Sequence, residues 1–159
     1  MDPEPSLTII HQNLNNALPI VIIPTIMWFV SQFLKFSIYS AKHGLNFKYL
    51  FEYGHLPSSH SASMAALIYA TYKFEGLSSP VFAIAFTVGL MTIFDAVKLR
   101  GYIGKYGETL NKLIKDSGFK KNNQYPRLKE RVGHTITEVV TGAILGLIGA
   151  YLLVRLLYL

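Results

Sequence analysis

The sequence predicts an all-α integral membrane protein, a helical bundle with about four transmembrane helices. Hydrophobic residues make up 51% of the 159 residues and only 15% are charged, which is more apolar than an ordinary soluble domain. The apolar residues form runs close to ~20 residues long, as a bilayer crossing requires. Most of the lysines and arginines lie between the third and fourth of these runs. We expect one membrane domain, residues 17–159, after a polar N-terminal tail, residues 1–16.

The first predicted membrane helix covers about residues 17–38. Its first part is nearly all apolar, although two prolines and Gln32 interrupt it. The tail before this helix contains Asp2 and Glu4 but no lysine or arginine, which differs from a signal peptide. We therefore expect the tail to be mobile or to lie at the membrane interface.

A polar loop, residues 39–57, leads to a short second helix over about residues 58–73. Because its apolar stretch is shorter than the other three, this helix either just crosses the membrane or lies buried among its neighbours. It begins with Ser58 and Ser59, residue types that cap helices, and the first N–H groups of a helix attract anions. His60 follows, and histidine exchanges protons near neutral pH. This segment therefore combines phosphate binding with acid–base chemistry.

The third predicted helix, about residues 80–99, follows a tight turn. A long basic loop, residues 100–132, comes next and includes a short helix around residues 108–115. The fourth helix covers about residues 133–157 and is apolar over most of its length. With four crossings, the loops after the first and third helices lie on the same side of the membrane.

Three glycines lie near one side of the fourth predicted helix, at Gly142, Gly146 and Gly149. The first two have the small-xxx-small spacing that lets two helices approach closely. This pattern indicates close packing, either within the chain or in a homodimer.

The basic segment between the last two helices indicates an anionic partner. Nucleic acid is not expected, because membrane helices flank the segment and few aromatic residues are interleaved with its cations. Membrane lipids or a phosphorylated lipid substrate fit better. The alternative is a solvated cytoplasmic loop that follows the positive-inside rule. The cations are Lys98, Arg100, Lys105, Lys112, Lys115, Lys120, Lys121, Arg127, Lys129 and Arg131.

His134 and Glu138 are four residues apart and therefore share one face of the fourth helix. A carboxylate beside an imidazole fixes the tautomer and stabilises the charged ring, as a basic or nucleophilic histidine requires. The alternative is a surface pair near a helix start, where glutamate is also favoured. We prefer a functional pair, because a carboxylate at membrane depth usually has a partner or a role. The predicted topology places this pair on the same membrane face as His60.

Other charged residues near the helix ends have simpler explanations. Asp95 can pair with Lys98 or another cation, and Lys35 can extend its amine to the interface. The spacing from His55 to His60 does not match a zinc motif. We therefore expect no metal and no cofactor.

Three separated segments together resemble the divergent PAP2 family, which is related to acid phosphatases and vanadium-dependent haloperoxidases. They are the sequences PSSHSA at 57–62, DAVKLR at 95–100, and LKERVGHT at 128–135 followed by Glu138 and Val139. The resemblance extends from about Gln32 to the C-terminus. It implies the three-motif site of type-2 phosphatidic acid phosphatases, in which one histidine attacks phosphorus and a second protonates the leaving oxygen.

By this resemblance, His134 matches the nucleophile, and Glu138 matches the acid that orients it, with glutamate in place of aspartate. His60 matches the general acid. Ser58 matches the phosphate-binding serine, and Ser59 stands where glycine is usual.

The cations of the phosphate site match the family less closely. Lys35 and Lys42 have the spacing of the first motif, but Lys42 replaces arginine. Leu128 occupies the position of the third-motif arginine, for which Arg131 or Arg100 would substitute. The other residues expected at the site are Lys98 as a phosphate ligand, with Asp95 and Lys129 in support.

The sequence thus predicts a metal-independent phosphatase that acts on a phosphatidate-like or polyprenyl phosphate through a phosphohistidine. One alternative is a non-catalytic lipid-phosphate-binding or transport-related membrane protein, and another is a purely structural membrane subunit. Haloperoxidase activity is disfavoured, because it requires bound vanadate and the phosphate site departs from the family pattern. The positive-inside rule places the motif loops in the cytoplasm, whereas the resemblance to extracytoplasmic lipid phosphatases favours the opposite side.

Overall fold

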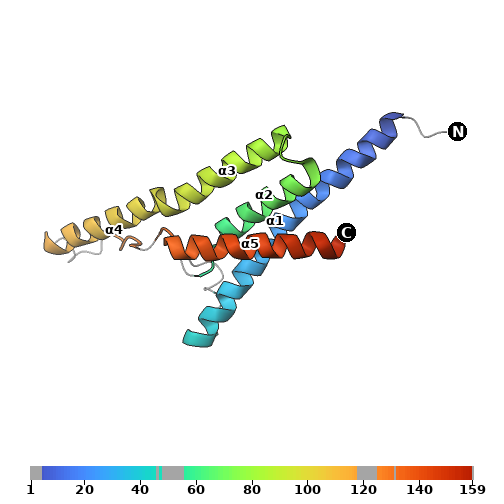
Figure 1. Ribbon diagram of the computed structural model, residues 1–159. Coiled ribbons are helices and arrows are strands. Elements are labelled where there is room, and N and C mark those ends of the chain that lie inside the picture. Colours follow the sequence, from blue (N-terminus) through green and yellow to red (C-terminus); the bar gives the residue numbers. More distant parts are fainter. Residues whose placement is uncertain (1–4, 46, 48–55, 118–124, 131, 159) are drawn as a thin grey trace.

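The computed structural model describes residues 5–45, 47, 56–117, 125–130 and 132–158, with the side chains of the first helix described from residue 15 onward. Within these ranges the chain forms helices and no strand, which confirms the all-α class (Figure 1). The helices are α1 (Pro5–His43), α2 (Ser59–Glu75), α3 (Pro80–Val97), α4 (Leu99–Asp116) and α5 (Ile136–Leu157).

Three of the described segments are long and apolar enough to cross a membrane, and they confirm an integral membrane protein. They are Asn15–His43 in α1, Pro80–Asp116 over α3 and α4, and Ile136–Leu157, which is α5. Helix α2 has 17 residues and is therefore ~26 Å long, slightly less than the ~30 Å hydrocarbon core. It is the short second helix of the about four that the sequence predicts.

Helix α2 lies at the centre of the bundle and packs against α1, α3 and α5. Its small residues allow this position, since Ala62, Ala66 and Ala70 are fully buried. The hydrophobic core is completed by Ile23, Met27, Ala150 and Val154 from α1 and α5. This arrangement matches the alternative in which the second helix lies buried among its neighbours.

The glycines of α5 provide the close contact with α2 inside the chain. A Cβ atom at Gly142 would collide with the backbone oxygen of Ser58, and one at Gly146 would collide with that of Ala62. Gly149 instead faces the side chain of Met27 on α1. Packing within the chain therefore explains the glycine pattern, and the homodimer alternative is not needed for it.

Helix α1 is longer than predicted at both of its ends. It begins at Pro5, where the sequence predicts a polar tail up to residue 16, and continues to His43. Proline is tolerated in the first turn of a helix, where its missing N–H is not needed. Pro24 also lies within α1, and its carbonyl oxygen accepts a hydrogen bond from Ser63 Oγ on α2 at 3.0 Å.

The predicted long loop is largely helical. Only Lys98 separates α3 from α4, which covers residues predicted as loop as well as the short helix around 108–115. Gly104 and Gly107 do not break α4, because their missing side chains let the backbone of residues 129 and 130 lie against the helix. The Asn111 side chain joins the same segment, donating to the Leu128 carbonyl at 2.9 Å and accepting from its N–H at 3.0 Å.

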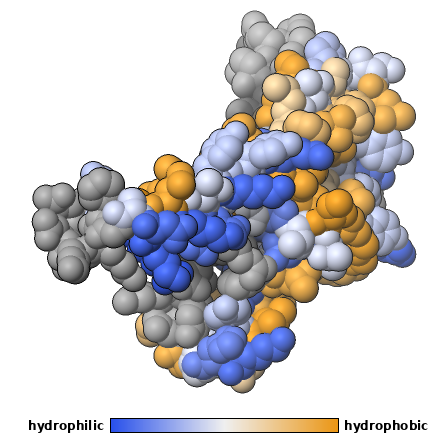
Figure 2. Space-filling view, turned by 90° about the vertical axis from the view of Figure 1, so that its left-hand side faces the viewer, coloured by the Kyte–Doolittle hydropathy of each residue, from blue (hydrophilic) through white to orange (hydrophobic). Residues whose placement is uncertain are grey.

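The end of the molecule that carries α4 is rich in polar residues. Figure 2 views this end and shows hydrophilic side chains gathered there beside hydrophobic surface. The charged candidate residues of the sequence lie toward this end, where α2 and α5 begin and where α3 passes into α4 (Figure 1).

Candidate active site

The starts of α2 and α5 are held against each other by backbone hydrogen bonds. The Ser58 N–H donates to the Glu138 carbonyl oxygen at 3.0 Å, and the His134 N–H donates to the Ala96 carbonyl oxygen at 3.0 Å. These two bonds join α2, α3 and α5 at one point. They bring the ring centroids of His60 and His134 to 6.2 Å from each other.

His134 and Glu138 form a buried pair at the first turn of α5. The Nδ1 atom of His134 lies 3.0 Å from Glu138 Oε2, and the two residues are only 9% and 3% exposed. An ionised carboxylate can only accept hydrogen bonds, so it favours the tautomer with the proton on Nδ1. The Nε2 atom of His134 then carries a free lone pair, as a nucleophile requires.

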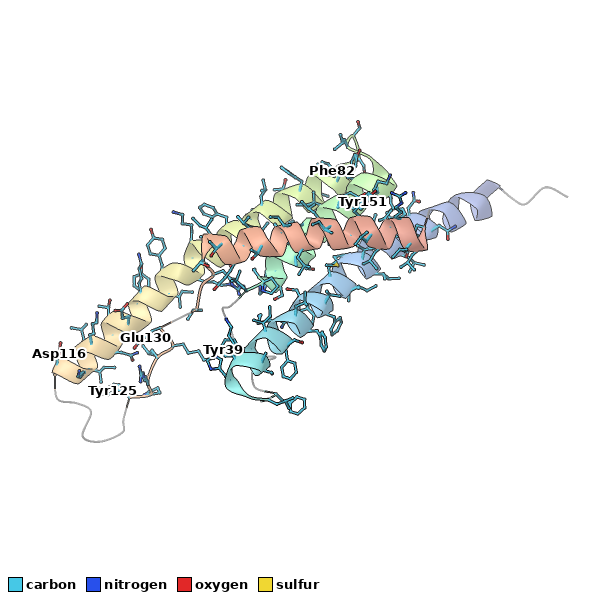
Figure 3. The ribbon with its side chains drawn as sticks, turned by 60° about the horizontal axis from the view of Figure 1, so that its bottom comes forward. Tyr39, Phe82, Asp116, Tyr125, Glu130 and Tyr151 are labelled. Carbon is cyan, nitrogen blue, oxygen red and sulfur yellow. The ribbon has the colours of Figure 1, made fainter. Side chains whose placement is uncertain are left out.

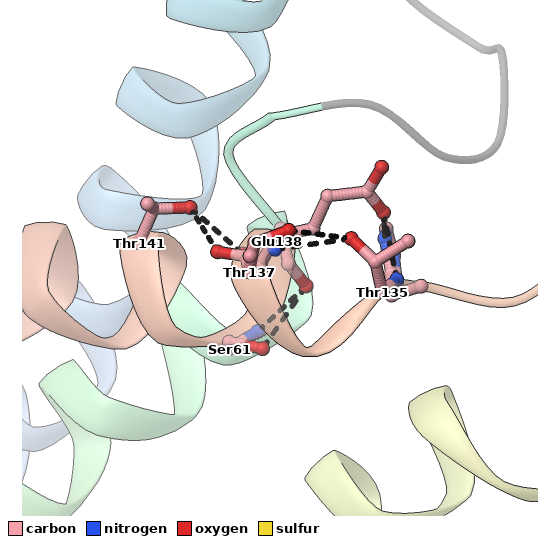
Figure 4. Close-up of polar contacts among 7 residues, drawn as sticks. Ser61, Thr135, Thr137, Glu138 and Thr141 are labelled. Atoms are coloured by element: carbon pink, nitrogen blue, oxygen red, sulfur yellow. Dashed lines mark hydrogen bonds and ion pairs between the residues drawn. The ribbon is translucent and has the colours of Figure 1, made fainter.

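Thr135 fixes the position of Glu138 through a capping box, which is the start of α5 in Figure 4. The Thr135 N–H donates to Glu138 Oε2 at 3.2 Å, and Thr135 Oγ1 accepts from the Glu138 N–H at 3.3 Å. Glu138 Oε2 therefore accepts a hydrogen bond from the N-cap residue of α5 and also lies within hydrogen-bond distance of His134. Sequence reasoning missed Thr135, although threonine three residues before glutamate at a helix start is a readable capping signal.

His60 lies in the second position of α2 and is partly buried. Its Nδ1 atom is buried and has no hydrogen-bond partner among the described residues. Lys35, Arg100 and Asp95 lie near enough to act on its charge, as does His134. Because a buried polar atom without a partner is costly, this nitrogen is well suited to bonding a bound ligand.

Ser58 and Ser59 are buried beside His60. Ser58 is the N-cap of α2, and its Oγ accepts from the N–H of Ser61 at 3.4 Å and from the Ser61 hydroxyl at 3.0 Å. A hydroxyl that accepts two hydrogen bonds still has its own proton to donate. The cap and a phosphate ligand are therefore compatible roles for Ser58, and Ser61 is a supporting residue that sequence reasoning missed.

Two of the predicted cations lie at the cluster that His60, His134, Glu138 and the two serines form. Lys35, on α1, is 4% exposed and interacts electrostatically with Glu138 and His60. Arg100, in the first turn of α4, is half-buried, and its Nε atom lies 3.4 Å from Asp95 Oδ2. Asp95 thus has the cationic partner that the sequence predicts, with Arg100 in place of Lys98.

The other predicted cations are not buried with the histidines. Lys42, Lys98 and Lys129 are exposed, although the backbone of Lys129 packs against α4. Arg131 lies outside the described residues. Lys35 and Arg100 are therefore the cations that the described structure brings to the cluster.

The described residues contain no group of three or more histidine, cysteine, aspartate or glutamate side chains arranged to hold a metal ion. The side chains gathered at this point of the bundle are two imidazoles, the two carboxylates of Glu138 and Asp95, two hydroxyls and two cations. Donors of this kind recognise anions such as carboxylate and phosphate, and the starts of two helices add to the positive field.

Comparisons with known proteins agree with the motifs. The sequence profile of the divergent PAP2 family matches residues 15–149, which include both histidines. A relative from Bacillus subtilis (strain 168), named "Uncharacterized membrane protein YuiD", is 33% identical over 106 residues, which are 60% of this chain and 67% of the relative. No solved structure matches the chain.

Proposed function

The chain belongs to the divergent PAP2 family, and we propose that it is an integral-membrane phosphatase that hydrolyses a lipid phosphate through a phosphohistidine on His134. The observation that carries this proposal is the buried His134–Glu138 pair facing His60. A phosphatidate-like or polyprenyl phosphate is the substrate we favour, because the cluster lies among membrane helices. The reaction needs no metal in this scheme.

In the first step, Nε2 of His134 attacks phosphorus while the bond from phosphorus to the lipid oxygen breaks. Glu138 holds the proton on Nδ1 and stabilises the positive charge that develops on the ring. His60 gives a proton to the departing lipid oxygen, and the products are a lipid alcohol and a phosphohistidine. General acid catalysis of this kind contributes roughly 10²- to 10⁴-fold to the rate.

In the second step, water attacks the phosphorus of the phosphohistidine and His60 takes the proton from this water. The nitrogen–phosphorus bond breaks, inorganic phosphate leaves, and both histidines return to their starting states. Lys35, Arg100 and Ser58 would hold the phosphate oxygens in both steps. Phosphoryl transfer depends mainly on such positioning and on neutralising the spread negative charge.

The second candidate function is binding of a lipid phosphate without turnover. One observation favours it, because Arg100 is already paired with Asp95 and Lys42 is exposed, which leaves fewer free cations than the family pattern implies. A non-catalytic protein of this kind would bind a lipid phosphate and tolerate His134→Asn.

The test is phosphate release by the purified protein in liposomes with a chelator present, with phosphatidate and a polyprenyl phosphate as separate substrates. We expect turnover by the unaltered protein, a loss of at least about 10³-fold in His134→Ala, and little change in His43→Ala, which alters an exposed histidine on α1. Activity that survives in His134→Ala would refute the mechanism. Bound substrate without any phosphate release would support the binding protein instead.

A further inference from the structure

Helix α4 carries an apolar stripe that no described part of the chain covers. Its members are Leu99, Ile103, Tyr106, Leu110 and Leu113, and each is between 47% and 64% exposed. Their separations alternate between four and three residues, which is the heptad pattern of a coiled-coil seam. This seam has isoleucine or leucine at the a positions and leucine or tyrosine at the d positions.

The stripe lies beyond the membrane if α3 alone makes the crossing. Helix α3 alone has 18 residues and is ~27 Å long, close to the ~30 Å of the hydrocarbon core. The segment Pro80–Asp116 has 37 residues and is ~55 Å long, so α4 lies beyond the hydrocarbon if α3 crosses it. Figures 1 and 3 show α4 continuing along the direction of α3 to Asp116 at its far end. With α3 as the crossing, lipid tails would not reach most of the stripe.

The other faces of α4 are accounted for. Its glycine face packs on the backbone of residues 129 and 130. Glu108 pairs with Lys112 at 2.8 Å on the side away from the seam, and Arg100, beside the first residue of the stripe, pairs with Asp95. Beside the middle of the stripe, the uncharged Thr109 stands on one side, and on the other side the backbone of Lys129 covers Gly107. Two such helices would therefore meet without repulsion between like charges at the seam.

We propose that the stripe binds the same stripe of a second copy, so that two α4 helices form a short parallel coiled coil outside the membrane. The parallel direction follows from membrane topology, because α4 of both copies leaves the membrane on the same side. A two-fold axis along the membrane normal relates the copies, and the same residues meet across it. The surface expected to join two copies is thus α4, whereas the glycine face of α5 is occupied within the chain.

The absence of cysteine from the sequence allows a direct test with single-cysteine variants. Two a-position residues of a parallel pair face each other across the seam, within reach of the ~4.4–6.8 Å between Cα atoms that a disulfide needs. Leu110→Cys is the test variant, and Glu108→Cys is the control on the opposite side of the same helix. Both full-length variants are reconstituted into liposomes at a low ratio of protein to lipid and oxidised.

We expect most Leu110→Cys chains to become covalent dimers and the Glu108→Cys chains to stay monomeric. Equal crosslinking of the two variants, or none in either, would overturn the proposal. A spin label at Leu110→Cys that is accessible to oxygen but shielded from a water-soluble nickel complex would assign the stripe to lipid, and this also overturns it. As a second measurement, Leu110→Glu should convert the detergent-solubilised dimer to monomer without loss of helix content, whereas Glu108→Gln should leave the dimer intact.

Discussion

The Nδ1 atom of His134 lies 3.0 Å from Glu138 Oε2, and the same carboxylate oxygen accepts the N–H of Thr135. Glu138, which belongs to the capping box at the start of α5, therefore also orients His134. The position of the proposed nucleophile depends on the folding of the first turn of α5.

Replacing Glu138 by glutamine tests the charge on this residue. The amide oxygen of glutamine can still accept a hydrogen bond from Nδ1, but it does not stabilise the charged ring. We expect kcat for phosphate release to fall by roughly 10²- to 10⁴-fold with little loss of folding. Glu75→Gln, at the exposed end of α2, is the control and should retain the activity of the unaltered protein.

We expect the main effect of replacing Thr135 to be a loss of stability. Thr135→Ala removes an N-cap hydrogen bond and should lower the free energy of unfolding by about 0.5–2 kcal/mol, measured by thermal unfolding in detergent. Thr87→Ala, inside α3 and exposed, should change stability by less. An unchanged melting temperature for Thr135→Ala would show that the capping box does not hold the start of α5.

The lysines of the first motif should differ in their effect on substrate binding. Lys35 is buried beside Glu138 and His60, whereas Lys42 is exposed. A hydrogen bond to a charged group contributes about 1.5–3 kcal/mol, so Lys35→Met should raise the dissociation constant of a lipid phosphate about 10- to 150-fold. Lys42→Met should change it by less than about threefold. Equal effects of the two variants would place the phosphate elsewhere.

The glycines of α5 should show graded sensitivity to alanine. Gly142→Ala and Gly146→Ala would both push α2 away from α5, because each Cβ would meet a backbone atom. Overpacking of this kind costs about 1–3 kcal/mol. Gly149→Ala should cost less, because it meets the flexible end of Met27.

Activity adds a second readout to the glycine series. Since Gly142 touches Ser58 at the site, Gly142→Ala should reduce phosphate release more than Gly146→Ala does at equal stability. The reverse order would mean that the contact with Ser58 does not position the site.

The membrane helices could be predicted from the sequence because the thickness of the bilayer sets the length of an apolar run. The sequence did not predict that residues 100–107 are helical. Gly101, Gly104 and Gly107 are typical of a loop when read alone, and their role becomes visible only when the segment that packs against them is placed. The sequence also left open which helix packs against Gly142 and Gly146, because the same spacing occurs in contacts within a chain and between chains.

Topology predicted that His60 and His134 lie on the same face of the membrane, since both precede or begin helices there. It did not by itself predict that the two rings meet. The sequence did not show which of the candidate cations are buried. Motif spacing favoured Lys42, but this residue lies in the last turn of α1 and is exposed. Whether a lysine is buried depends on where the neighbouring helices end. The spacing between two lysines gives no information about those ends.

The central claim is that His134 carries the phosphoryl group during turnover. The most direct measurement is to mix the protein in liposomes with a radiolabelled lipid phosphate, to stop the reaction within one turnover at alkaline pH, and to locate the label by mass spectrometry. We predict an acid-labile, base-stable label on His134, which forms more slowly in His60→Asn and is absent from His134→Ala. Release of phosphate by the unaltered protein without any label on His134 would contradict the account.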